Sequence, residues 1–215
     1  MSISKNDVLK VLTEVRARKG DRNFRQSVDL VVNFRELDLK RPENRINVNA
    51  TVPHSIGKTA KVCVFASGDL ALRARRAEVD LVIEPDRLRE LGTNRKEAKK
   101  LFSKYDLFLA ETSMMANVGR VAGPILGPRG KMPTPVPPNA PIEQVIEREK
   151  KSVPLRTRDK AFIQLGVGTE DMEDDKLAEN TEVILSTLVS SLKRGMGNIR
   201  SVYIKTSMGE PVRLK

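Results

Sequence analysis

The chain carries few side chains suited to nucleophilic or metal chemistry. His54 is its only histidine and Cys63 its only cysteine, so no intrachain disulfide can form. His54 lies between Pro53 and Ser55, which is typical of a linker, and no nucleophile or second ligand stands at helix or strand spacing from it. Cys63 lies within an apolar run, as a buried, inert thiol does. We expect no catalytic residue, no metal and no cofactor.

Two further motifs have a ligand-binding and a simpler interpretation. The turn 66–69, Ala-Ser-Gly-Asp, follows an apolar run, where dinucleotide folds place a glycine-rich phosphate loop. A single glycine does not make that loop, and Ser67 or Asp69 is expected to cap a helix instead. The acidic run 170–175 lacks the spaced ligands and central glycine of a calcium loop. It precedes a predicted helix, where negative charge is favourable. A nucleotide-dependent enzyme that uses the middle of the chain stays open as the alternative function.

Two polar clusters have the composition of an RNA contact. The first is Arg22-Asn23-Phe24-Arg25-Gln26-Ser27, and the second is Ser201 followed by Thr206-Ser207-Met208-Gly209. RNA is read largely through its 2′-hydroxyls and exposed base faces, and serine and threonine hydroxyls both donate to and accept from a 2′-hydroxyl. We expect Met208 to pack on a base or sugar and Gly209 to let the backbone approach a ribose. The second cluster is equally compatible with a plain turn after a strand.

The charge balance favours a polyanionic partner. Lys and Arg total 39 against 28 Asp and Glu, a formal charge of +11, and each neutralised phosphate releases counterions. No basic amphipathic helix with Trp or Phe on its apolar face and no apolar run near eighteen residues is present, so no membrane partner is expected. The N-terminus lacks a signal-peptide pattern, which indicates a cytoplasmic protein. A DNA-binding regulator is a further alternative, although no helix-turn-helix pattern is apparent.

The elements that must position these residues differ between the ends and the middle of the chain. Strands with one wet face are predicted at both ends, over 27–33, 45–52, 161–167 and 201–206, with helices over 4–15 and from Asp174 or Asp175 to 193. Continuous apolar strands over 61–66, 81–83 and 106–110 alternate with helices over 70–77 and 95–104. We therefore predict an α/β fold: an α+β split domain (1–60 and 153–215) and an inserted doubly wound, Rossmann-like parallel-sheet domain (61–152).

The joining segments are rich in Gly and Pro. Residues 53–58 and 152–154 are predicted crossings between the domains. Residues 119–141 contain too many breakers for regular structure, apart from a short helix near Met114, and a charged helix follows over 142–150.

Several motifs in order along the chain resemble one family, large-subunit ribosomal protein one, the L-one family of the mobile stalk. The matching motifs are Ile125-Leu126 with Gly127-Pro128-Arg129-Gly130-Lys131-Met132-Pro133, Val52-Pro53-His54 with Gly57-Lys58, Asn23-Phe24 with Ser27, and Ser201-Val202-Tyr203 leading into Ser207-Met208-Gly209. The combination is specific, and it covers essentially the whole chain. The short N-terminus and Arg41-Pro42-Glu43-Asn44-Arg45 are more similar to archaeal than to bacterial members.

The resemblance implies a non-enzymatic structural protein of the large subunit. Its split domain would bind a kinked helical junction in ribosomal RNA through Phe24, Ser27, Ser201 and the triplet Ser207, Met208 and Gly209. Arg129 and Lys131 would make a secondary RNA contact. The resemblance further implies a monomer when free, contact with exit-site transfer RNA, and translational repression by binding its own messenger RNA.

Overall fold

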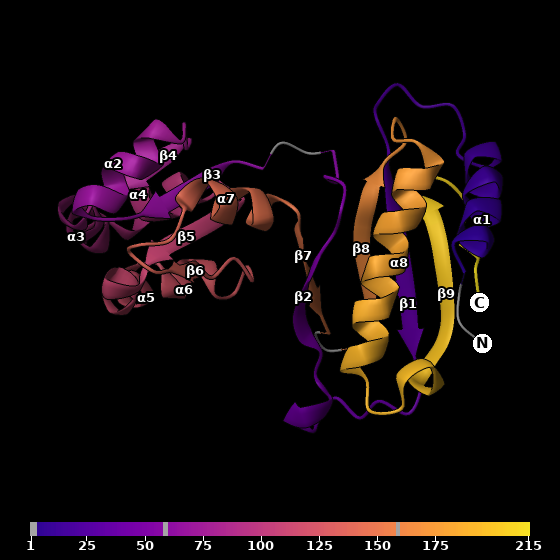
Figure 1. Cartoon of the computed structure of the whole chain (residues 1–215). Coiled ribbons are helices and arrows are strands. Elements are labelled where there is room, and N and C mark those ends of the chain that lie inside the picture. Colours follow the sequence, from indigo (N-terminus) through magenta and orange to yellow (C-terminus); the bar gives the residue numbers. More distant parts are fainter. Residues whose placement is uncertain (1–3, 58–59, 158–159) are drawn as a thin grey trace. The chain divides into compact units, whose positions relative to one another are not determined.

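The computed structural model describes residues 4–57, 60–157 and 160–215, so Lys58 of the predicted crossing lies outside the described residues. Contacts between Cα atoms divide the chain into two compact units. The split unit comprises Met1–Lys58 and Lys151–Lys215, and the inserted unit comprises Thr59–Lys150. Both chain termini lie in the split unit (Figure 1).

The split unit is built on a four-stranded antiparallel sheet with the order β10-β9-β1-β8. These strands are β1 (Ser27–Phe34), β8 (Phe162–Thr169), β9 (Ile199–Thr206) and β10 (Val212–Arg213). Side chains alternate along β1, so that Val28, Leu30 and Val32 are buried while their neighbours are half-exposed. Helices α1 (Lys5–Ala17) and α8 (Asp174–Ser191) bury the apolar face of the sheet (Figure 1).

A separate antiparallel pair, β2 (Asn47–Thr51) and β7 (Ser152–Arg156), contributes Ala50, Val153 and Leu155 to the same core. Residues 152–154, predicted as a crossing, instead begin β7, and the chain passes between the two units just before them, at Lys150 and Lys151. Pro154 is compatible with this strand because a two-stranded pair has only edge strands. Short 3-10 turns lie at Pro42–Asn44 and Gly195–Asn198.

The helix starts follow local capping chemistry. The Ser4 hydroxyl accepts a hydrogen bond from the Asp7 N–H at 3.3 Å and the Asp7 carboxylate accepts from the Ser4 N–H at 3.1 Å, which closes a capping box before α1. The cap predicted for α8 is wrong by one residue: Glu173 is the N-cap, and Asp174 lies in the first turn. There Asp174 pairs with Arg16 of α1 at 2.6 Å.

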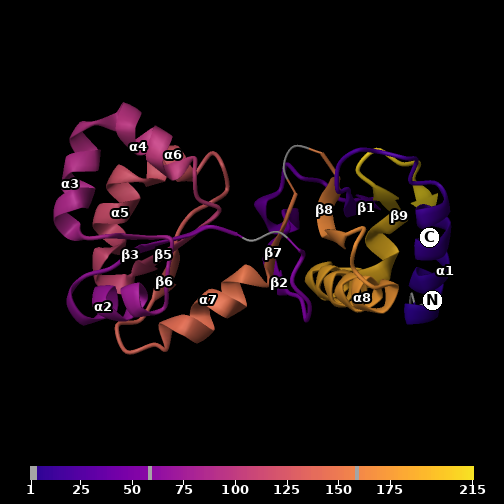
Figure 2. The ribbon, with the colours of Figure 1, turned by 90° about the horizontal axis from the view of Figure 1, so that it is seen from above.

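The inserted unit is a parallel sheet of order β4-β3-β5-β6 with helices on both faces (Figure 2). Its strands are β3 (Val62–Phe65), β4 (Leu81–Ile83), β5 (Leu107–Glu111) and β6 (Thr134–Val136). One face packs against α2 (Gly68–Arg76) and α7 (Ile142–Lys150), and the other against α3 (Pro85–Thr93), α4 (Arg95–Phe102), α5 (Met115–Val121) and α6 (Gly123–Leu126). The predicted α/β fold class is confirmed.

The expectation that 119–141 lacks regular structure is wrong. Helix α5 runs to Val121 after a 3-10 turn at Thr112–Met114, α6 follows at once, and β6 joins the sheet. Pro124 is tolerated because it lies in the first turn of α6, where its missing N–H would have had no partner. Pro135 is tolerated because β6 is an edge strand. Helix α3 was not predicted at all.

Candidate nucleic-acid interface

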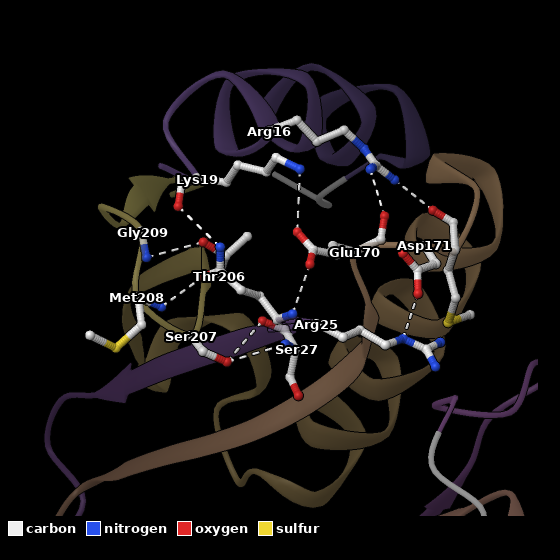
Figure 3. Close-up of polar contacts among 12 residues, drawn as sticks. Arg16, Lys19, Arg25, Ser27, Glu170, Asp171, Thr206, Ser207, Met208 and Gly209 are labelled. Carbon is white, nitrogen blue, oxygen red and sulfur yellow. Dashed lines mark hydrogen bonds and ion pairs between the residues drawn. The ribbon is translucent and has the colours of Figure 1, made fainter. Parts of the chain in front are cut away.

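Apart from Ser201, the two polar clusters predicted from the sequence lie side by side at one end of the split unit's sheet (Figure 3). Ser201 pairs with Asn33 at the opposite end of the β1–β9 pair, away from the rest of its cluster. The Ser207 N–H donates to the Ser27 carbonyl at 2.9 Å, and the Ser27 N–H donates to the Ser207 hydroxyl oxygen at 3.1 Å. That hydroxyl in turn donates to the Ser27 carbonyl at 3.3 Å. The turn after β9 is therefore fixed to the first residue of β1.

Gln26 connects this turn to the end of α1. Its side chain is 1% exposed; the side-chain N–H donates to the Lys19 carbonyl at 3.2 Å, and the side-chain oxygen accepts from the Met208 N–H at 3.0 Å. Its own backbone N–H donates to the Glu170 carboxylate at 2.9 Å. Sequence reasoning placed Gln26 in the first cluster and missed this role.

Glu170 belongs to the acidic run and supports the candidate interface through contacts with Gln26, Lys19 and Arg16. It also accepts from the Lys19 ammonium group at 3.4 Å, while Arg16 donates to its backbone carbonyl at 2.7 Å. The backbone hydrogen bond from Gln26, and then the Lys19 ammonium group, hold the pKa of Glu170 below its ordinary value against the opposing effect of burial. The acidic run thus organises the site as well as preceding a helix.

The neighbouring arginine is also engaged. Arg25 pairs with Asp171 at 2.6 Å and donates to the Thr169 hydroxyl at 2.7 Å. Figure 3 shows Arg16, Lys19 and Arg25 all directed at the 170–174 segment. Much of the local positive charge is therefore neutralised within the protein.

The hydrogen bonds of Gln26, Ser27 and Ser207 hold this end of the sheet together, and we call this arrangement the frame. Phe24 and Met208 project from it. Their side chains are 53% and 58% exposed. Phe24 lies two residues before Gln26 and Met208 is hydrogen-bonded to it. The arrangement offers two apolar faces on a rigid support, suitable for stacking on a base or sugar.

Three of the predicted contact residues lie deeper. Thr206 is 2% exposed and its hydroxyl accepts from the Gly209 N–H at 3.1 Å, whereas buried Ser201 accepts from the Asn33 side chain at 3.0 Å. A Cβ on Gly209 would lie 2.3 Å from the Thr206 hydroxyl oxygen and 3.1 Å from the Arg18 carbonyl. Gly209 is thus required by packing inside the protein, and the expected role in admitting a ribose is not needed to explain it. Thr206 shapes the turn from within.

The two basic residues of the predicted secondary contact differ. The Lys131 ammonium group donates to the Tyr105 carbonyl and to Asp106, each at 3.0 Å, so it anchors its own loop. Arg129 is exposed, and its side chain makes no hydrogen bond or ion pair with the described residues.

A carboxylate fills the place where the inserted unit would hold a nucleotide phosphate. The strand order reverses between β3 and β5, and the turn after β3 is the expected phosphate loop. There the Ser67 N–H and hydroxyl donate to Glu111 at 2.9 and 2.8 Å, and Ser113 donates to it at 2.6 Å. The hydrogen bond from Ser113, and then those from Ser67, hold the pKa of Glu111 below its ordinary value, against burial. Ser67 is the N-cap of α2 by position only, since its side chain makes no capping bond.

The remaining reactive side chains have structural roles. The His54 ring contacts the Glu179 carboxylate at 2.7 Å through Nε2, and the His54 backbone N–H donates to the Asn180 side chain. His54 therefore fastens the crossing segment to α8. Cys63 is buried, and burial raises its pKa to about 12. The described part of the chain contains no group of three or more acidic, histidine or cysteine side chains arranged for a metal. No helix among those residues is both long and apolar enough to cross a membrane.

Comparisons with known proteins identify the family. The model of the ribosomal protein L1p/L10e family matches residues 13–210. The large ribosomal subunit protein uL1 of Methanothrix thermoacetophila is 48% identical over 90% of this chain and 91% of the relative. The uL1 proteins of Methanothermobacter thermautotrophicus (44% identical, 97% of this chain and 98% of the relative) and Methanothermococcus thermolithotrophicus (45%, 99% and 100%) are similar as well. The chain therefore belongs to the ribosomal protein L1p/L10e family.

Proposed function

We propose that the protein is a structural constituent of the large ribosomal subunit in the cytoplasm and binds ribosomal RNA at the end of the β1–β9 pair. The single observation that carries the site is the pair of exposed side chains, Phe24 and Met208, mounted on the frame around Gln26. Membership of a ribosomal protein family and the names of the relatives support the partner.

The proposed contact relies on shape more than on charge. Arg16, Lys19 and Arg25 already face carboxylates or carbonyls, so little of their charge is left for phosphates. Apolar stacking on Phe24 and Met208 and hydroxyl contacts from Ser27 and Ser207 act over short distances and depend on RNA geometry. Because the frame is already formed, little ordering entropy is lost when RNA binds.

Three finer roles follow from the family and extend this proposal. The bound RNA is a kinked junction of the mobile stalk; the protein contacts transfer RNA leaving the exit site; and it represses translation of its own messenger by binding a similar fold there. No catalytic step belongs to this function. A reporter carrying the protein's own messenger leader tests repression, which the Met208→Ala variant should relieve.

Ultraviolet crosslinking of the tagged protein in cells, followed by sequencing of the attached RNA, tests the partner and the site together. We expect a dominant set of reads from one region of large-subunit ribosomal RNA, with crosslinked peptides that contain Phe24 or Met208. Reads spread evenly over cellular RNA, or peptides only from the inserted unit, would contradict the proposal.

A further inference from the structure

Helix α4 of the inserted unit carries a row of lysines without partners. Lys96 and Lys100 lie four residues apart on its exposed side, opposite buried Ala98 and Phe102. The helix ends at Phe102, and Lys104 is exposed in the turn that follows it. Within residues 4–57, 60–157 and 160–215, none of these three side chains makes a hydrogen bond or an ion pair. We call Lys96, Lys100 and Lys104 the α4 stripe.

Several cations elsewhere in the same unit are paired. Arg73 contacts Asp69 at 2.9 Å, Arg75 contacts Glu84 at 2.5 Å, and Arg89 contacts Asp86 at 3.3 Å. The only acidic residue of α4, Glu97, pairs with Arg87 of the preceding helix at 2.5 Å. Lys100 in the last turn of α4 complements the helix dipole, but Lys96 lies in the first turn, where positive charge is unfavourable, and like charges four residues apart destabilise a helix. Helix stability therefore does not explain the α4 stripe as a whole.

The stripe continues toward the loop after α6. Lys131 donates to the Tyr105 carbonyl and to Asp106, immediately after Lys104, and thereby places the 127–131 turn at the end of α4. Arg129 in that turn is exposed and without a partner among the described residues. Arg129 thus lies in a segment that is fastened next to Lys104, with the Asp106 carboxylate engaged by Lys131.

We infer that the α4 stripe and Arg129 bind the phosphate backbone of RNA, as a second surface separate from the Phe24–Met208 site. Lys96 and Lys100 are about 6 Å apart along the axis of α4, a spacing comparable to that of neighbouring phosphates. Exposed, unpaired lysines suit a salt-sensitive contact with phosphates that reads no sequence. This inference deepens the proposed function and rests on RNA being the partner.

The test compares full-length variants with equal loss of charge. The stripe variant is Lys96→Gln, Lys100→Gln and Lys104→Gln; the matched control is Arg75→Gln, Arg87→Gln and Arg89→Gln, in the same unit, where each cation already faces a carboxylate. Binding to purified archaeal large-subunit ribosomal RNA and to an unrelated short RNA duplex is measured across a potassium chloride series. Met208→Ala is measured in parallel.

For the stripe variant we expect the slope of log affinity against log salt to be shallower by about two, with affinity at low salt at least about tenfold weaker on both RNAs. The control should change much less, and Met208→Ala should weaken only ribosomal RNA binding, at unchanged slope. An unchanged slope in the stripe variant, as expected if the surface fits an acidic protein, would overturn the inference. Equal effects of stripe and control variants would overturn it too, since total charge would then be responsible. Failure of Met208→Ala alone would overturn the proposed site and leave the stripe supported.

Discussion

The buried side-chain oxygen of Gln26 accepts a hydrogen bond from the backbone N–H of the exposed Met208 at 3.0 Å. The same amide group donates to the Lys19 carbonyl at 3.2 Å, so the end of α1 and the turn after β9 share one internal anchor. A residue hidden from any ligand therefore fixes the backbone of the residue that a ligand would touch.

Replacing Gln26 with alanine should weaken ribosomal RNA binding without removing an exposed atom. The change leaves the Met208 N–H and the Lys19 carbonyl without their partner, which should lower the free energy of unfolding by about 1–3 kcal/mol. Chemical denaturation and RNA titration measure the two effects. In a double-mutant cycle with Met208→Ala, the losses in RNA affinity should fall short of the sum, because both changes disable the same contact. Additive losses would show that Gln26 acts on stability alone.

Replacing Met208 with alanine should reduce ribosomal RNA affinity by roughly 1–3 kcal/mol, by analogy with base-stacking contacts, at nearly unchanged stability. The side chain is 58% exposed, so its loss opens no cavity. Met132→Ala is a suitable control because Met132 is an exposed methionine too, at 47%, but lies in the inserted unit. Equal affinities for the wild type and Met208→Ala would disprove the site.

A side chain at Gly209 should damage the fold as well as the binding. If Gly209 served only to let the backbone approach a ribose, as expected from the sequence, a side chain there would weaken binding and leave stability unchanged. A Cβ there, however, meets the Thr206 hydroxyl and the Arg18 carbonyl. Overpacking of this kind costs about 1–3 kcal/mol, so even Gly209→Ala should lower the melting temperature. Calorimetry decides between the two expectations. A melting temperature equal to that of the wild type, together with weaker RNA binding, would restore the first.

Glu170 should make the interface sensitive to acid. Its pKa in the folded protein is lowered from the ordinary 4.5, so its contribution to stability is complete above that value and is lost as pH falls through the folded pKa. Glu170→Gln keeps an acceptor for the Gln26 N–H and loses the charge that faces Lys19. The difference in melting temperature between wild type and Glu170→Gln should be full at neutral pH and shrink below about pH 4.5. A difference independent of pH would show that the charge has no role.

The sequence predicted most elements because their residues carry periodic signals that need no distant partner. Alternation gave β2, β8 and β9, and apolar runs gave β1, β3 and β5. Failures arose where tertiary position overrides composition, as with Pro124 in the first turn of α6 and Pro135 on an edge strand.

The candidate site was predictable only in its outer parts. The types of Phe24 and Met208 suggested a contact before their exposure was seen. Gln26 could not be assigned its role, because Met208 and Glu170 approach it from positions 182 and 144 residues away. The burial of Thr206 was predictable, because Thr206 continues the buried face formed by Val202 and Ile204 along β9. The burial of Ser201 was not, because alternation places it with the half-exposed Tyr203 and Lys205.

The split unit should fold and bind RNA without the inserted unit. Removing residues 59–150 and joining the ends with a flexible Gly/Ser linker leaves about 125 residues, ample for an independent core. The cores are separate: the cluster built on β1, β8, β9 and α8 contains no residue of the inserted unit. The crossing is also held locally, since Thr51 pairs with Ser152 and the Val52 N–H donates to the Lys151 carbonyl at 2.9 Å.

We expect the shortened protein to unfold cooperatively and to discriminate ribosomal RNA from an unrelated duplex, because Phe24, Gln26 and Met208 all lie in the split unit. Its salt slope should be shallower than that of the full chain, since the α4 stripe is removed with the inserted unit. Circular dichroism measures folding and gel shift measures binding, with the shortened Met208→Ala variant as the control. A cooperative fold that has lost discrimination would move recognition to the inserted unit. A chain that does not fold would show that the split unit depends on the inserted one, despite their separate cores.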